Sequence, residues 1–254
     1  MSQQSEEGVW RDIQEVLFRR GDLSTFVVHL CRDYEDGSQA KDNLKSIITE
    51  GVLLARTARG WARHVDQSER GDSQNVVCFT ETPLDHLDLQ TGNIKKRRYQ
   101  FQPFGLAFTK MQARRRGINP VWYVDRTPGH GWKPYHALNA LKDEAVATGF
   151  TDHPVSDMLP FIEEMYTLNE NVYEWWWERE WRHLGPLSFA PGKDVAFYIC
   201  PESEMTEFNK MLQQTKRDAG APPPPCIDAR WGLERILAHL MNLRPDEISP
   251  FAQS

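Results

Sequence analysis

The sequence lacks the features that mark secreted, membrane and zinc-binding proteins. Its four cysteines stand far apart without a Cys-x-x-Cys pair, so no metal site is expected, and buried free thiols in a reducing compartment are the simplest interpretation. No apolar run approaches the length that spans a bilayer, so no membrane partner is expected. The polar, acidic opening "MSQQSEEGVWRDIQEV" predicts neither a signal peptide nor a transit peptide, which favours a cytoplasmic protein.

Glycine-rich phosphate-binding motifs are absent as well. No G-x-G-x-x-G follows a predicted strand and no G-K-[ST] occurs, so a doubly wound nucleotide-binding fold is not expected. The apolar fraction of 40% is sufficient for a large core, and strands and helices are mixed without a strict βαβ order. We therefore predict an α+β fold with a mixed, largely antiparallel sheet and flanking helices. A single domain is expected over 1–254, in which 221–254 supplies a stiff proline-rich spacer and a helix.

The charge balance is acidic, with a formal net charge of −6. This argues against nucleic-acid binding over the whole surface and suits a basic protein partner. Two short basic runs, "KKRR" at 95–98 and "RRR" at 114–116, are more typical of solvated faces or helix ends than of a binding site. They would serve a nucleic acid only if they cluster in space with the acidic residues described below.

Hydrophobic periodicity predicts the order of the elements. Alternating β-branched or aromatic residues indicate strands, whereas apolar residues at helical spacing indicate helices. Capping patterns place the end of one helix at Gly51 and the N-cap of another at Ser203, and Pro83 lies near the start of a short helix. A long polar loop is expected over 51–74, and a short basic helix ends at Gly117. The predicted strands are 25–31, 75–81, 104–110, 119–125 and 194–200, and the main predicted helices are 5–18, 38–51, 135–148, 154–167, 203–220 and 233–243.

The most unusual stretch is "YEWWWEREWRHLG" at 173–185, in which four tryptophans are interleaved with three glutamates and two arginines. As a strand over 174–182, it would place Glu178, Glu180 and Arg182 on one face and an aromatic cluster on the other. As a helix, it would pair Glu178 with Arg182. The aromatic density favours the strand.

Glu178 and Glu180 are the candidate catalytic residues of this stretch. On one strand face their carboxylates would repel each other, so at least one pKa should rise unless a cation lies nearby. Such a pair can stabilise a developing cation or hold a ribose hydroxyl. The simpler interpretation is an ion-paired strand edge, in which Arg182 neutralises Glu180.

An ordered set of motifs resembles the AbiGi family of bacterial abortive phage-resistance proteins. The segment "NVYEWWWEREWRHL" at 171–184 resembles the family element N-F-Y-x-E-R-E-W-R-Y-V-P. The sequence departs from the family in "HLC" for H-F-T and in "FTETPL" for F-C-D-I-P-L. Family members are labelled antitoxins of abortive-infection systems, which implies phage defence with a cognate toxin or antitoxin protein as partner. Other elements agree in order over roughly residues 24–200: "HLCRD…NLKSIITEGV", "VVCFTETPLDHL", "YQFQPFGLAFTKMQARRRGINPVWYV" and "WKPY".

The order of these elements is also similar to the ADP-ribosyltransferase fold, including the DarT-like toxins. That similarity implies NAD as a substrate, with His29 on an early strand holding a ribose and Thr80 beside the nicotinamide. It implies that Glu180 steadies the oxocarbenium-like transition state and that Glu178 orients a nucleic-acid or protein acceptor. Arg182 either neutralises the acids or clamps the pyrophosphate in a bidentate contact.

Each implied role has a structural alternative. His29 lies between apolar neighbours and is equally explained as a core histidine, and Thr80 as an ordinary strand residue. Three functions follow: an NAD-consuming ADP-ribosyltransferase or glycohydrolase, a non-catalytic antitoxin or adaptor, and a nuclease in which Glu174, Glu178 or Glu180 holds a metal. The lack of a paired-aspartate motif places the nuclease last, and the E-x-E face favours the NAD-consuming enzyme over the antitoxin.

Overall fold

The computed structural model describes residue 13 and residues 19–95, 97, 99–169, 171–215 and 222–243. Within these ranges the chain has an α+β fold whose sheets are mixed and mostly antiparallel, so the predicted fold class is confirmed. All but one residue of the helix expected over 5–18 lie outside the described residues. The last part of the helix expected over 203–220 lies outside them as well.

The main sheet has eight strands and supplies most of the framework. Their bounds are β1 Phe26–Leu30, β3 Thr57–Ala58, β4 Asn75–Thr80, β5 Gly105–Thr109, β6 Asn119–Pro120, β10 Glu180–Leu184, β12 Phe197–Ile199 and β13 Cys226–Ile227. The order is β13-β12-β5-β1-β4-β10-β6, with β3 attached to β4, and every pair is antiparallel except β12 with β13. The strands predicted over 25–31, 75–81, 104–110 and 194–200 are therefore confirmed, within shorter bounds.

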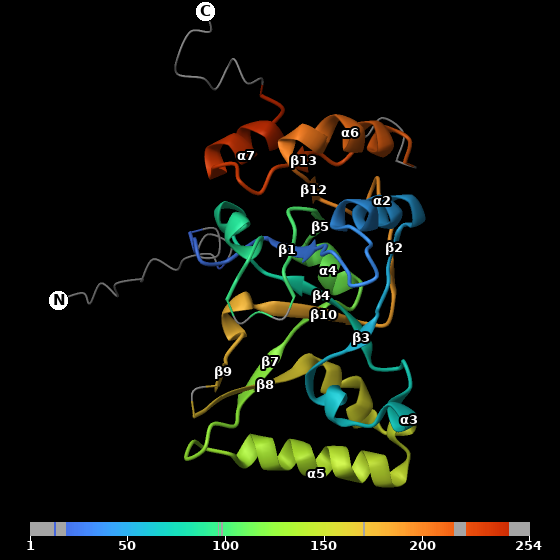
Figure 1. The fold of residues 1–254 in the computed structure, drawn as a ribbon, viewed down its shortest axis with the longest axis vertical. Coiled ribbons are helices and arrows are strands. Elements are labelled where there is room, and N and C mark those ends of the chain that lie inside the picture. The colour runs from blue at the N-terminus through green and yellow to red at the C-terminus, as the bar shows by residue number, and fades with distance from the viewer. Residues whose placement is uncertain are drawn as a thin grey trace, which may run out of the picture.

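A second sheet is formed by β7 (Trp122–Asp125), β8 (Ile162–Leu168) and β9 (Asn171–Tyr173), of which β7 and β8 are parallel. A separate pair joins β2 (Val52–Leu53) to β11 (Leu187–Ser188). The helices are α2 Ala40–Glu50, α3 Gln67–Arg70, α4 Lys110–Arg115, α5 Lys133–Thr148, α6 Met205–Gln213 and α7 Leu233–Leu240. In Figure 1, α6 and α7 lie at one end of the molecule and α5 at the other, next to the second sheet. None of the described helices is long and apolar enough to cross a membrane.

The main sheet is covered on both faces. Strand alternation directs Val27 into a core shared with α2 and α6, and Val28 into a core shared with α7. Leu44 and Ile48 of α2 lie one helical turn apart and are buried in the first of these cores. Gly51 ends α2 with a left-handed φ of 64°, so the predicted C-terminus of this helix is confirmed.

The helix predicted over 154–167 is wrong. Pro154 and Pro160 lack N–H donors and lie in the 3-10 turns that occupy its first half. The second half is β8, whose parallel pairing with β7 buries Glu163 and Glu164. The structure of this segment depends on pairing with another strand and on ion pairs with arginines far away in the sequence. Hydrophobic periodicity carries no information on either.

Several smaller expectations also differ from the structure. The strand expected over 119–125 is divided, because β6 pairs with β10 in the main sheet whereas β7 pairs with β8. The short helix after Pro83 consists of two successive 3-10 turns, and α6 begins at Met205 without Ser203 as its N-cap. The loop expected over 51–74 contains β2, β3 and α3. All four cysteines are free thiols, as predicted, and the proline tract leads into β13.

Candidate functional site

The tryptophan-rich stretch is neither one continuous strand nor a helix. It forms β9, then a 3-10 turn over Trp176–Glu178, and then β10, which begins at Glu180. Arg179 separates the turn from β10 and adopts a left-handed φ of 48°. The strand predicted over 174–182 is therefore wrong in its first half, and Glu178 and Glu180 do not share a strand face.

Neighbouring β4 holds this turn in place. The Thr80 hydroxyl donates to the Glu178 carbonyl oxygen at 2.6 Å and is also bonded to the Thr82 hydroxyl at 2.8 Å. The Glu81 amide donates to the Arg179 carbonyl oxygen at 3.1 Å. Thr80 thus positions the backbone between the two glutamates.

Glu180 lies in a buried ion pair with Arg182 of the same strand. The Arg182 Nε lies 3.0 Å from one carboxylate oxygen of Glu180, and Nη2 lies 2.7 Å from the other. Arg182 is only 1% exposed, and it also donates to the Pro160 carbonyl oxygen at 2.6 Å and to Glu163 at 2.6 Å. The guanidinium is therefore fully paired, as a buried charge must be, and the predicted ion pair between Glu180 and Arg182 is confirmed.

The two glutamates have opposite pKa shifts. Burial raises the pKa of Glu180, but the Arg182 charge and hydrogen bonds outweigh it and hold the pKa below its usual range. Burial raises the pKa of Glu178, and its 2.9 Å ion pair with Arg97 opposes this only in part, while the charge of Glu180 adds to the rise. The side chains of Glu178 and Glu180 keep 18% and 19% of their surface exposed.

Two further polar groups lie close to Glu180. The Cys78 thiol lies near the carboxylate, and burial and the Glu180 charge raise the pKa of that thiol well above its usual range, so it stays protonated. The buried hydroxyl of Tyr123 is close enough for the charge of Glu180 to raise its pKa, and it has no hydrogen-bond partner among the described residues. Neither residue was expected from the sequence.

Beside the glutamates lies an arginine–tyrosine ladder formed by Arg56, Tyr34, Arg32, Tyr99 and Arg59. The Arg32 guanidinium carbon is 4.7 Å from the Tyr34 ring centre and 3.7 Å from that of Tyr99. Arg56 is 5.2 Å from Tyr34, and Arg59 is 5.3 Å from Tyr99. These contacts are within the range of cation–π attraction.

The ladder is electrostatically joined to the glutamates. The Arg59 charge lowers the pKa of both Glu178 and Glu180. Within the described ranges, no carboxylate forms an ion pair with Arg32, Arg56 or Arg59. This leaves cationic groups next to the carboxylates that can take an anionic ligand. The ladder comes from loop residues far apart in the sequence, so local patterns do not reveal it.

His29 is placed differently from the other predicted site residues. Cross-strand pairing puts Val28, Thr80 and Glu180 on one face of the main sheet, so His29 projects from the other face. Its Nδ1 is 2.9 Å from the Cys78 carbonyl oxygen, its ring packs edge-on against Phe79, and burial lowers its pKa. The structure therefore brings Thr80, Glu178, Glu180 and Arg182 together, with the half-buried His29 on the opposite face of the sheet.

A cavity of about 330 Å³ lies on the other side of the turn. Glu81 lines it and is saturated by Lys110 at 2.8 Å, Arg179 at 2.8 Å and the Trp181 indole at 3.1 Å. This carboxylate, unlike Glu178, has every oxygen occupied by the protein itself. The remaining lining residues are Asp22, Thr82, Pro83, His86, Leu89, Gln90, Trp177 and Arg179.

The basic runs separate in space. Arg97 of the first run joins the site through Glu178, whereas Arg116 of the second is paired with Asp194. In the described part of the chain, no three or more histidine, cysteine, aspartate or glutamate side chains gather so as to hold a metal ion. Comparison with protein-family models, with curated proteins and with solved structures gave no match to this chain.

Proposed function

We propose that this protein is an NAD-consuming enzyme of phage defence, an ADP-ribosyltransferase or NAD glycohydrolase, with an ADP-ribosyltransferase-like site at Glu180. The observation that carries the proposal is the pair of neighbouring glutamates whose pKa values shift in opposite directions, beside a ladder whose arginines form no ion pair with a described carboxylate. Two carboxylates with divided pKa values are the arrangement that acid–base and electrostatic catalysis require.

Glu180 supplies the electrostatic part of this mechanism. Its low pKa keeps it ionised at neutral pH, so it can stabilise the positive charge that develops on the ribose as the bond between C1′ and the nicotinamide nitrogen breaks. The bonding electrons pass to the nicotinamide ring, which is cationic in NAD and leaves neutral. No general acid is therefore needed.

Glu178 supplies the proton transfer. Its raised pKa lies closer to neutrality than that of an ordinary glutamate, which suits a general base. It removes the proton of the acceptor hydroxyl, or of water, as that oxygen bonds to C1′. The acceptor is a nucleic acid or a protein in the transferase, and water in the glycohydrolase.

The arginine–tyrosine ladder supplies the binding of the substrate. Guanidinium groups form charge-assisted hydrogen bonds with pyrophosphate oxygens, and tyrosine rings stack with a nucleobase. Arg182 does not serve this purpose, because it is saturated by two glutamates and a carbonyl oxygen.

The test measures nicotinamide release, and transfer of labelled ADP-ribose to a cell lysate, by purified protein. Glu180→Gln is expected to lower both by about 10²–10³-fold, the usual cost of removing one electrostatic catalytic group. Glu174→Gln is the matched control, because Glu174 is exposed in the same stretch and, among the described residues, bonds only the Thr167 hydroxyl. Thermal melts show whether each variant is folded. Absence of NAD binding by the wild type at millimolar concentration would overturn the proposal.

A second candidate is a non-catalytic antitoxin or adaptor that binds a partner protein. Trp122, Trp176 and Trp177 support it, because their exposures of 53%, 55% and 41% are unusual for tryptophan, which is enriched at protein interfaces. A wild-type protein that binds no NAD but loses its partner after Trp176→Ser would establish this function.

A further inference from the structure

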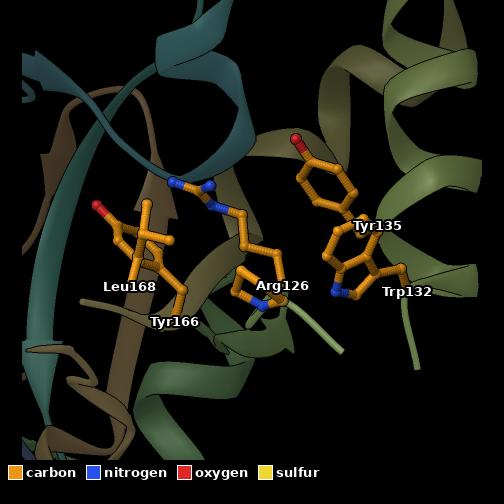
Figure 2. Close-up of a pocket in the computed structure, with 6 residues that line it drawn as sticks. Arg126, Trp132, Tyr135, Tyr166 and Leu168 are labelled. Atoms are coloured by element: carbon orange, nitrogen blue, oxygen red, sulfur yellow. The ribbon is translucent and has the colours of Figure 1, made fainter. Parts of the chain in front are cut away.

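A separate cavity of about 180 Å³ lies between the second sheet and the start of α5. Figure 2 shows Tyr166 and Leu168 on one side and Trp132 and Tyr135 on the other, with Arg126 between them. Pro128 completes the lining. None of these residues belongs to the site around Glu180.

The walls of this cavity are held rigidly. The Arg126 amide donates to the Met165 carbonyl oxygen at 2.9 Å, which fixes Arg126 beside β8. Its guanidinium carbon lies 3.8 Å from the ring centre of Tyr166, so cation and ring are stacked. The Trp132 indole donates to the Thr127 carbonyl oxygen at 2.6 Å, which fixes the opposite wall. A cavity built in this way is ready for a ligand without rearrangement.

Arg126 has hydrogen-bond donors that a ligand can use. Its Nε is 2.5 Å from Glu164, and no described residue accepts a hydrogen bond from its outer nitrogens. The side chain is 29% exposed, so solutes reach it. A guanidinium with free donors selects an anionic group, and it disfavours a cationic ligand by like charge.

The size of the cavity and its lining residues indicate what the non-anionic part of the ligand is. The cavity is smaller than the roughly 300–1,000 Å³ of sites for drug-sized molecules, so it fits one ring system rather than a dinucleotide. Trp132 and Tyr135 offer flat aromatic surfaces on which a planar ring can stack, whereas the Tyr166 ring is already covered by the Arg126 guanidinium and by the stacked Tyr173 ring.

We propose that this cavity binds a flat heteroaromatic ring carrying one anionic group, of the class of the nucleoside 5′-monophosphates. The ring stacks against Trp132 and Tyr135, and the phosphate binds the outer nitrogens of Arg126. The proposal does not depend on NAD turnover, because the site, its residues and its ligand differ from those at Glu180.

A charge chain connects the two sites. Its members alternate in sign, so an anion bound to the outer nitrogens of Arg126 adds a negative charge at the end of the chain. The chain begins at Arg126, whose Nε is 2.5 Å from Glu164, and Glu164 is 2.6 Å from Arg63 Nη2. Arg63 Nη1 is in turn 3.0 Å from Glu163. Glu163 is 2.6 Å from Arg182 Nη2, and Arg182 binds Glu180.

The experiment titrates the purified chain with nucleoside monophosphates, with the matching nucleosides and with inorganic phosphate, using calorimetry. Saturable binding of at least one monophosphate is expected, with the nucleoside and phosphate each weaker by about tenfold or more, because each lacks one half of the recognition. Equal binding of the nucleoside would overturn the role of Arg126. Absence of binding by every monophosphate at millimolar concentration would overturn the site.

Variants locate the binding. Arg126→Gln is expected to weaken monophosphate binding by about tenfold or more, and Leu168→Trp, which keeps Arg126 and its ion pair, is expected to block the cavity by filling it. Arg59→Gln and Trp122→Leu are the matched controls, because one alters the ladder and the other an exposed residue of β7 that does not line the cavity. Loss of binding in Arg59→Gln, with retention in Leu168→Trp, would place the ligand at the ladder and refute the proposal.

Discussion

Glu178 illustrates how burial prepares a single residue for proton transfer. Its pKa is raised above the ordinary value of 4.5 chiefly by burial, so in the proposed enzyme the acid limb of ADP-ribose transfer should lie above pH 4.5. Glu178→Gln is expected to lose this limb and to lower transfer by about 10²–10⁴-fold, the usual worth of general acid–base catalysis. Nicotinamide release should fall less, because Glu180 stabilises bond cleavage.

The measurement is the pH profile of kcat/KM for both reactions, from pH 4 to 8 as a rough working range set by the pKa of ordinary carboxyl and imidazole groups. Retention of the wild-type acid limb by Glu178→Gln would assign that limb to another group and contradict the role of Glu178.

Tyr123 tests the cost of an unpaired hydroxyl. Because its buried hydroxyl has no partner among the described residues, Tyr123→Phe should leave the free energy of unfolding unchanged or increase it by up to about 1 kcal/mol. Tyr198→Phe is the matched control, since the Tyr198 hydroxyl donates to the Pro191 carbonyl oxygen at 2.9 Å and its removal should cost about 1 kcal/mol. Urea denaturation measures both. A loss in Tyr123→Phe as large as in the control would mean that an ordered water satisfies the hydroxyl.

Residue-scale prediction from sequence succeeded where neighbours along the strand decide the geometry. Alternation correctly places Glu180 and Arg182 on one face and Trp181 on the other, because all three lie within β10. It fails at Glu178, because Arg179 adopts a left-handed φ of 48° that no local pattern marks for arginine. That conformation is held by Thr80 and Glu81, which are distant in the sequence.

At the scale of elements, the end of β4 and the start of β10 form one unit. Thr80→Val keeps the shape of the side chain but removes the hydroxyl that donates to the Glu178 carbonyl oxygen, which leaves buried acceptors without their partner. We expect a loss of about 1–3 kcal/mol in the free energy of unfolding and a lower transfer activity, because Glu178 loses its fixed position.

The control for this change is Thr49→Val, which removes an exposed hydroxyl bonded to the Lys45 carbonyl oxygen in α2. Its effect on denaturant midpoint should stay within about 0.5 kcal/mol. Equal effects of both valine substitutions would show that the turn before β10 is held by other contacts.

The helices and strands also differ in how well the local sequence predicts their secondary structure. The amphipathic pattern of α2 was sufficient, because Leu44 and Ile48 face one core whatever strands surround them. The pattern of β8 was not sufficient, because Glu163 and Glu164 suggest a solvated helix until the arginines that pair with them are known. Burial of charge is a property of the assembled sheets rather than of the segment.

At the scale of the whole molecule, the charge chain from Arg126 to Glu180 joins the second sheet to the main sheet. Glu164 follows Arg126 in this chain, is only 8% exposed, and contacts Arg63, Arg126 and His64. Burial raises the pKa of Glu164, but its hydrogen bonds with His64 and Arg63 and their charges outweigh burial and lower the pKa from 4.5 to about 2. The ionised form is therefore the one that the folded protein favours.

This shift predicts a pH dependence of stability. A carboxyl whose pKa is depressed by folding stabilises the protein above its unfolded pKa, and the stabilisation is lost as the pH falls through the folded value. Glu164→Gln should therefore cost roughly 3 kcal/mol at neutral pH, and the difference from wild type should shrink between pH 4.5 and about 2. Denaturant unfolding across this window measures it.

The matched control is Glu69→Gln, which changes an exposed glutamate of α3 that forms no ion pair with any described residue. Its stability should follow the wild type at every pH, because a solvated carboxyl gains little from folding. If Glu164→Gln also follows the wild type, the ion pairs of Glu164 contribute no net stability, and other contacts hold the two sheets together. If the difference appears and vanishes in acid, the charge chain fastens the second sheet to the main one, which is the mechanical connection that a ligand at Arg126 would need to influence Glu180.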